Sequence, residues 1–208
     1  MKKLNPVWIL LAAMLVLASC KKDDDTNPTP TNPSTPSSSV FTFFKTGASW
    51  TYDTYDSDGG AHFNQTYTIN SISAQNYATV NWNVAGLYSY TVYWYADNNK
   101  FSMLCYPGDT KMLIFCDADP TVGESWAETW IDSTTNVTDS CYIIATNETV
   151  TVPAGTFTNC IKIKETTTDD PLCYKYYWLS LSAGVIKTEG TTAQDYPTII
   201  YEDLSAHN

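Results

Sequence analysis

Apolar and polar residues alternate with a period of two along most of the chain from about residue 40 onward. In the stretch ATVNWNVAG, Val80, Trp82 and Val84 alternate with threonine and asparagine, and in NCIKIKE, Ile161 and Ile163 alternate with lysines. This pattern predicts strands with one buried and one solvated face. No window of helical length keeps the three-and-four spacing of an amphipathic helix, so the fold class is expected to be all-β.

Turn-forming residues separate these runs. DGG precedes AHFNQTYTI, PGD lies between FSMLCY and TKMLIFC, and DDP precedes LCYKYYW. Such clusters favour tight connections between antiparallel strands. About ten to twelve short strands at this spacing predict an antiparallel meander, which must curl into a half-barrel or barrel, or fold into a β-sandwich as the alternative, to protect its edges.

The N-terminus has the features of a secretion signal over residues 1–19. Lys2 and Lys3 precede a short apolar run, which is too short for the roughly twenty residues that a membrane-spanning helix needs. The run ends in Leu-Ala-Ser followed by Cys20, which resembles the lipobox of bacterial lipoproteins. The resemblance implies acylation of Cys20, palmitate included, and anchoring of the mature chain to a membrane. The alternative is an ordinary leader with an incidental cysteine.

Residues 20–39 are expected to form the lipidated cysteine and a disordered tether rich in Pro, Ser and Thr, with no residues that could seed a core. Residues 40–208 are expected to form a single β domain. The segment Lys22–Asp25 resembles the signal that sends lipoproteins of Bacteroidetes to the extracellular face of the outer membrane. A solvated charge run is the alternative explanation.

Charge narrows the range of partners. Without Lys2 and Lys3 the chain has nine lysines, no arginine and 22 acidic residues, a net charge of −13. Phosphate-rich ligands favour basic grooves and the forked contacts of arginine, so no nucleic-acid partner is expected. No cofactor is expected either.

Five cysteines follow Cys20, and in an exported protein they indicate disulfides before metal ligands. No CxxC motif is present and His62 and His207 are the only histidines, so no metal site is expected. Alternation places Cys160 and Cys173 on the outward face of what should be adjacent strands, and the prediction is that they pair. The residues expected to share that face are Lys162, Lys164, Lys175 and Tyr177. Cys105, Cys116 and Cys141 stay unassigned.

Four segments resemble a loose set of uncharacterised outer-membrane lipoproteins of the Bacteroidetes type. They are FTFFKTGASWTY with its Gly-x-x-Trp-x-Tyr motif, DPTVGESW, VTVPAGTFTNCIKI with its Pro-Ala-Gly-Thr-Phe turn, and YYWLSLSAGVIKTE. The resemblance implies a curved antiparallel sheet like that of bacterial lipoprotein-carrier proteins, and no catalytic residues. The motifs are expected to be structural, with Pro153 and Gly155 shaping a turn, Phe157 filling the curl and Gly184 allowing a strand to bend.

Sequence signatures of hydrolases are absent, and no enzyme is expected. In GESWAETWID, Glu124, Glu128 and Asp132 share a face with Trp126 and Trp130 if the stretch is a strand. Acids beside tryptophans could line a sugar site, and a solvated sheet edge is the alternative. The aspartates of DTYDSDGG lack the downstream glutamate of a calcium loop, so a plain turn is favoured.

Aromatic residues are the most abundant contact surface. In LYSYTVYWYAD, Tyr93 and Tyr95 face outward, opposite Trp94. Either another segment covers them, or they form a platform for sugars or partner proteins. We therefore expect a binding or interaction module that contacts a glycan or an envelope protein through Tyr93 and Tyr95, or through Trp126 and Trp130. A carrier of an acyl chain or another apolar ligand is the alternative, and an enzyme comes third.

The tripeptide Asp-Ser-Thr around Ser133 resembles the O-glycosylation site of exported Bacteroidetes proteins. A polar turn is the alternative explanation.

Overall fold

A computed structural model describes residues 40–60, 62–103, 113–132, 135–170, 172–193 and 196–208. The expected leader and tether, with Cys20, Cys105 and Ser133, lie outside the described residues. None of the described segments forms a helix that could cross a membrane.

Twelve strands make up the described chain. They are β1 (Ser49–Asp56), β2 (His62–Ile72), β3 (Tyr77–Val84), β4 (Tyr88–Ala96), β5 (Lys100–Met103), β6 (Cys116–Asp117), β7 (Ser125–Asp132), β8 (Thr135–Val152), β9 (Gly155–Thr167), β10 (Tyr174–Ser180), β11 (Gly184–Ala193) and β12 (Tyr196–His207).

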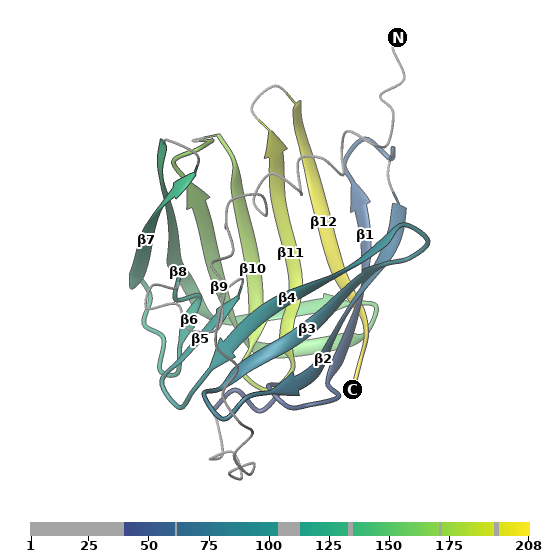
Figure 1. Cartoon of the computed structure of the whole chain (residues 1–208). Helices are drawn as coiled ribbons and strands as arrows, with labels where there is room; N and C mark the ends of the chain where they lie inside the picture. The colour runs from purple at the N-terminus through teal and green to yellow at the C-terminus, as the bar shows by residue number, and fades with distance from the viewer. Residues whose placement is uncertain (1–39, 61, 104–112, 133–134, 171, 194–195) are drawn as a thin grey trace, which may run out of the picture.

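All twelve strands belong to one antiparallel sheet, in the order β6-β5-β4-β3-β2-β1-β12-β11-β10-β9-β8-β7. Every neighbour in the sheet is a neighbour in sequence except β1 and β12, which join the two ends of the meander. The sheet curls so that β2, β3 and β4 pass in front of β10, β11 and β12 (Figure 1). The all-β prediction and the curled antiparallel meander are confirmed. The sandwich alternative is wrong, because the strands form a single sheet that does not close.

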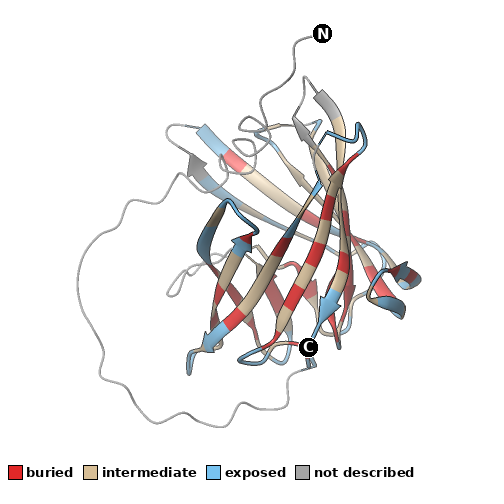
Figure 2. Ribbon diagram, turned by 90° about the vertical axis from the view of Figure 1, so that its right-hand side faces the viewer, coloured by how far each residue is buried: buried red, intermediate tan, exposed pale blue. Residues whose placement is uncertain are grey.

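Alternation along each strand produces the concave core, visible as regular buried stripes in Figure 2. On β1, Trp50 and Tyr52 are buried and the residues between them are half-buried. The Trp50 ring lies 5.5 Å from the Trp94 ring on β4, and Trp94 lies 5.9 Å from Phe101. These contacts fill the concave side with aromatic rings at the level of Trp50.

The segment before β1 seals one end of the curled sheet, the lower end in Figure 1. Phe41 and Phe43 are buried, and the Phe43 ring lies 5.2 Å from Phe101 and 5.9 Å from Trp50. Backbone hydrogen bonds tie the segment to both walls, from Thr42 N to Leu181 O at 3.0 Å and from Gly47 N to Ile69 O at 2.8 Å. We call residues 41–47 the plug.

Two of the sequence motifs meet at Trp50. Its indole nitrogen donates to the carbonyl of Ala183 at 2.6 Å, and a Cβ on Gly184 would lie 2.8 Å from that nitrogen. Gly184 also has a φ of 86°, which favours glycine. The Gly-x-x-Trp motif and the closing Gly-Val-Ile-Lys strand are therefore one packing unit, as the structural interpretation of these motifs predicts.

The hairpin of β8 and β9 is much longer than its neighbours, and its far end bends behind the sheet (Figure 1). Three register irregularities on β8 between Ile143 and Val150 produce the bend. At the tip, Ala154 N donates to Leu204 O of β12 at 3.0 Å. The hairpin thus covers part of the convex face.

The predicted Cys160–Cys173 disulfide is wrong. All four described cysteines are free thiols. In the β9–β10 ladder, Ile161 pairs with Leu179 and Thr166 with Tyr174. These pairs are about 17 Å apart at roughly 3.4 Å per residue. The two cysteines lie beyond them at opposite ends, whereas a disulfide needs about 4.4–6.8 Å between Cα atoms.

The assumed faces also need correction. Lys175 pairs with Glu165 and Tyr177 with Ile163, so both point to the concave side, while Lys162 and Lys164 point to the convex side. Alternation within each strand was correct, but the register between the strands was not.

Candidate functional site

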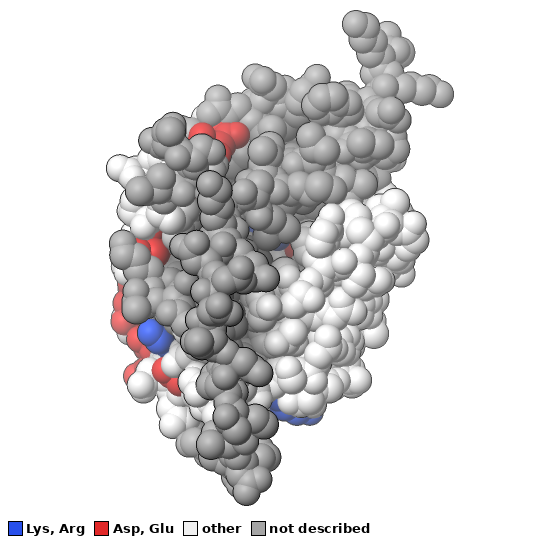
Figure 3. Space-filling view, in the orientation of Figure 1, with Lys and Arg blue, Asp and Glu red and all other residues white. Residues whose placement is uncertain are grey.

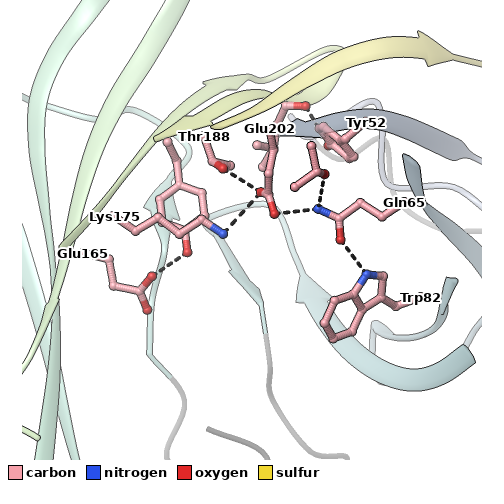
Figure 4. A network of polar contacts seen from close by, with 10 residues as sticks. Tyr52, Gln65, Trp82, Glu165, Lys175, Thr188 and Glu202 are labelled. Carbon is pink, nitrogen blue, oxygen red and sulfur yellow. Dashed lines mark hydrogen bonds and ion pairs between the residues drawn. The ribbon is translucent and has the colours of Figure 1, made fainter. Parts of the chain in front are cut away.

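A layer of polar side chains crosses the concave face above the aromatic core. It is centred on Glu202 of β12, toward which Gln65, Lys175 and Thr188 reach from β2, β10 and β11 (Figure 4). Directly paired residues share a face, and the register places Thr54, Thr188 and Tyr177 beside Glu202 across neighbouring strands. We call this set, with Gln65, Glu165 and Lys175, the polar layer.

Three donors satisfy the carboxylate of Glu202. Gln65 Nε2 donates to its Oε1 at 2.6 Å, Thr188 Oγ1 donates to its Oε2 at 2.6 Å, and Lys175 Nζ lies 3.3 Å from Oε2. Burial opposes ionisation, but the Lys175 charge and the bonds from Thr188 and Gln65 outweigh it and hold the pKa of Glu202 below its usual value. Glu202 is therefore an ionised carboxylate with its acceptor positions engaged.

Gln65 connects Glu202 to Trp82 on β3. Its Oε1 accepts a hydrogen bond of 2.8 Å from Trp82 Nε1, while its Nε2 also donates to Thr54 Oγ1 at 3.1 Å. Because these bonds fix both ends of the amide, the orientation of Gln65 is set by Glu202 on one side and Trp82 on the other.

Glu165 is a second acid in the layer with a different environment. Its Oε2 accepts a 2.5 Å hydrogen bond from the Tyr177 hydroxyl. Burial raises the pKa of Glu165 above its usual value, although the bond from Tyr177 and the Lys175 charge act in the opposite direction. The two acids of one cleft therefore have pKa values shifted in opposite directions.

Four aromatic rings line the concave side of β2, β3 and β4 beside Gln65. Tyr67 stacks on Trp82 at 5.7 Å with an interplanar angle of 3°. Tyr88 and Tyr90 flank Trp82 at 5.9 Å and 6.1 Å. We call these four residues the aromatic wall.

Solvent reaches this part of the concave face. The side chain of Lys175 is 39% exposed and that of Glu202 is 15% exposed, while Tyr90 is 37% exposed. Figure 3 shows an uncharged surface over β3 and β4 and, beside it, a hollow in which basic and acidic atoms are visible. In Figure 4, Glu165 and Lys175 lie across this space from Gln65 and Trp82. We call the space between the polar layer and the aromatic wall the cleft.

The polar layer was missed at the sequence level, although a signal was present. Glu202 has the same phase on its strand as Leu204, and Glu165 continues the phase of Ile161 and Ile163. A charged residue at a core-facing position of an alternating strand is unusual unless it is paired. The two glutamates at core-facing positions were therefore the sequence signal for a polar site inside the curled sheet.

The predicted contact residues lie on opposite faces of the sheet. Tyr93 pairs with Thr79 and Tyr95 with Tyr77, which places them on the convex face as predicted. Both are half-buried, and the Tyr95 hydroxyl donates to Asp97 Oδ2 at 2.7 Å.

Trp126 and Trp130 pair with the buried residues Cys141 and Val137, so they face the concave side on the edge strand β7. Glu128 lies on the same face, as expected, and Trp130 is 39% exposed. The two predicted patches therefore cannot form one site, and neither belongs to the polar layer.

Among the residues that the structure describes, no group of three or more His, Cys, Asp or Glu side chains is arranged to hold a metal ion. The DTYDSDGG segment forms the β1–β2 turn, in which Asp56 Oδ1 accepts bonds from the backbone of Asp58 at 3.1 Å and Gly60 at 2.7 Å. These bonds stabilise the turn without a cation.

The sequence matches no protein-family model and no curated protein. Two solved structures share its fold. A protein from Bacteroides fragilis, described as exported and as having a YmcC-like fold, superposes with a TM-score of 0.53 at 17% identity over 79% of this chain and 96% of that chain. A protein from Parabacteroides distasonis, described as a lipoprotein, gives 0.52 at 17% identity over 80% and 99%. At these identities the likeness shows the curved β fold alone.

Proposed function

We propose that this protein is an exported lipoprotein that binds a neutral, hydroxyl-rich ligand, such as a glycan, in the cleft. The observation that carries the proposal is the pairing of an accessible polar layer with an aromatic wall. A sugar stacks its apolar ring face on tyrosine or tryptophan, while carboxylate, amide and ammonium groups bond its hydroxyls. Gln65, Lys175 and Glu165 supply those polar groups beside Trp82 and Tyr90.

The charges of the cleft support a neutral ligand. Two carboxyl groups face one ammonium group, and the lysine is already paired with Glu202. An anionic ligand would meet uncompensated acids as it loses its water. This observation disfavours phosphate-rich and fatty-acid ligands.

The carrier alternative is less well supported. An acyl chain needs a dry apolar cavity, and at the level of Trp50 the concave side is filled by rings 5.2–5.9 Å apart. Above that level the chain would lie against Glu202 and Lys175, which would lose hydration without gaining partners.

Two carboxyl groups in one cleft also raise the enzymatic alternative. Glu202 accepts from three donors, so its lone pairs are engaged and it is a poor nucleophile or base. We therefore propose binding in preference to catalysis.

For location, we propose lipid attachment at Cys20 and display on the extracellular face of the outer membrane. The basis is the lipobox-like LASC, the Lys22–Asp25 segment and the exported and lipoprotein descriptions of the two proteins that share the fold.

Two tyrosines on opposite faces of β4 provide a matched test. Tyr90 belongs to the aromatic wall, and Tyr93 belongs to the convex patch predicted from the sequence. The released form of the Cys20→Ala chain should be screened on glycan arrays, and the affinity for the best ligand measured by titration calorimetry. In that form, Tyr90→Ala should weaken binding at least tenfold, about 1.4 kcal/mol, and Tyr93→Ala should change it little.

The reverse pattern would move the site to the convex face, where Tyr93 and Tyr95 are the predicted contacts. No binding to any glycan, together with uptake of fatty acid by the same protein, would replace the proposal by the carrier alternative.

A further inference from the structure

One edge of the open sheet lies against the concave side of the opposite half. Strand β6 ends one edge of the sheet and β7 ends the other. Phe115, which precedes β6, packs its ring edge-on at 4.5 Å against Tyr177 of β10. Residues just before β7 bond to β8, from Gly123 N to Ile143 O and from Ile143 N to Glu124 O, both at 2.9 Å. The β6 edge therefore lies against the inner face of the opposite half of the sheet.

Strands β6 and β8 each contribute a cysteine to the hydrophobic core. Cys116 on β6 and Cys141 on β8 are both fully buried and belong to the same apolar cluster. Cys141 pairs across the ladder with Glu165, which accepts the Tyr177 hydroxyl bond. Cys116 follows Phe115, whose ring rests on the same tyrosine. Both cysteines thus lie near Tyr177, because Cys116 follows the residue that packs on its ring and Cys141 pairs with the residue that accepts its hydroxyl bond.

The electrostatics of the thiols agree with this placement. Burial raises the pKa of Cys116 to about 12, with a further contribution from Asp117. Burial also raises the pKa of Cys141, and Glu165, Asp139 and Cys116 raise it further.

We propose that Cys116 and Cys141 form a disulfide in the exported protein, which links the β6 edge to β8 and closes the curl of the sheet. The four described cysteines are thiols in the structure, and among them Cys160 and Cys173 lie at opposite ends of the β9–β10 ladder. The inference depends on export to an oxidising compartment and not on the ligand of the cleft.

The reaction is a thiol–disulfide exchange with an oxidoreductase of the cell envelope. One thiolate of the chain attacks the enzyme's disulfide, and the second thiolate then attacks the mixed disulfide. The new S–S bond forms as two protons and two electrons leave the chain, and the oxidoreductase is released as a dithiol. The bond must form before the core closes, because buried thiols with raised pKa values exchange slowly.

The test is a disulfide map of the full chain exported through its own leader. Digestion after Lys and Glu separates the four described cysteines, because Glu124 and Glu128 lie between Cys116 and Cys141, Glu148 precedes Cys160, and Lys162 follows it. The expected product without reductant is residues 112–124 linked to residues 129–148. Free thiols at both positions, or Cys116 linked to Cys105, would overturn the proposal.

Thermal unfolding gives a second measurement that does not require cysteine variants to fold equally well. Reductant should lower the melting temperature of the exported protein by roughly 5–10 °C, since the bond closes a loop of about 25 residues. Cys160→Ser is the matched control and should keep this shift. The double Cys116→Ser, Cys141→Ser protein should show no response to reductant, and an undiminished response would contradict the pairing.

Discussion

Replacing Glu202 by glutamine tests the account of the polar layer most directly. The substitution keeps the shape of the side chain and replaces one acceptor oxygen by an NH2 donor. In the native layer, one oxygen accepts from Gln65 and the other from Thr188 and Lys175. The threonine hydroxyl can reverse its role and accept a bond, but the lysine cannot.

The expected loss of stability follows from the hydrogen-bond donors that no longer have an acceptor. If the new amide keeps its oxygen toward Gln65, its NH2 group faces the ammonium of Lys175. If it turns over, its NH2 faces the NH2 of Gln65, and turning Gln65 as well would present a donor to the indole N–H of Trp82. Every arrangement leaves one donor against another, so we expect a loss of about 1–3 kcal/mol in the free energy of unfolding at pH 7.

Glu165→Gln is the matched control. The new amide oxygen can still accept the Tyr177 bond, and no other bond to Glu165 is disturbed. Because the pKa of Glu165 is raised in the folded state, its ionised form destabilises the fold above the unfolded pKa of about 4.3. Removing that charge should leave stability unchanged or raise it at pH 7.

The two variants should also depend on pH in opposite ways. The lowered pKa of Glu202 means that its contribution to stability is present above about 4.3 and is lost as the pH falls through the folded value. The deficit of Glu202→Gln should therefore shrink in acid. The advantage of Glu165→Gln should instead grow as the pH rises from about 4.3 toward the raised folded value.

Urea unfolding followed by tryptophan fluorescence at pH 7 and at several values down to pH 3 measures both trends. Equal losses in the two variants at pH 7, or a Glu202→Gln deficit that stays constant into acid, would refute the assignment of a lowered pKa to Glu202 and a raised pKa to Glu165.

Three further substitutions test the sheet and the anchor. In Gly190→Ala, the new Cβ would lie 2.5 Å from Tyr174 O and 2.9 Å from Lys175 Cα, both backbone atoms, so we expect a loss of about 2–4 kcal/mol in urea unfolding. Gly86→Ala has no atom within 4 Å of its Cβ and should lose only about 1 kcal/mol, because its φ is 76°. Cys20→Ala should block lipid attachment and leave an unprocessed or released protein. Retention of the processed variant in the outer membrane would contradict the lipobox. Protease added to intact cells should remove the wild-type domain, and full protection would place it in the periplasm.

The sequence predicts the strands well because alternation is local. Val80 and Trp82 lie on one side of β3, as their spacing indicates. Which faces of two strands coincide depends on the register between them, and a shift of one residue reverses every side chain. This is why Lys175 was expected beside Lys164, although it lies beside Glu165 in the fold.

The polar layer depends on contacts that no local pattern encodes. Glu202 on β12 bonds Gln65, which lies two strands away on β2 and 137 positions away in sequence. Lys175 reaches the same carboxylate from β10, two strands away on the other side. The phase of Glu202 beside Leu204 could have indicated a polar group inside the curl, but not its partners. The bulges that bend β8 over the convex face are equally invisible in the alternation, and they bury Cys160.

The position of the plug has a consequence for how the molecule would face if Cys20 carries a lipid. The chain enters the described fold at Val40, directly before the plug, so a lipid on Cys20 would hold the sealed end toward the leaflet. Glu202 lies opposite Thr54, four residues further along β1 than Trp50, or about 13 Å from the sealed end. The mouth of the cleft would then open to the medium, so a molecule arriving from outside meets it first, while one leaving the bilayer would have to pass around the whole domain.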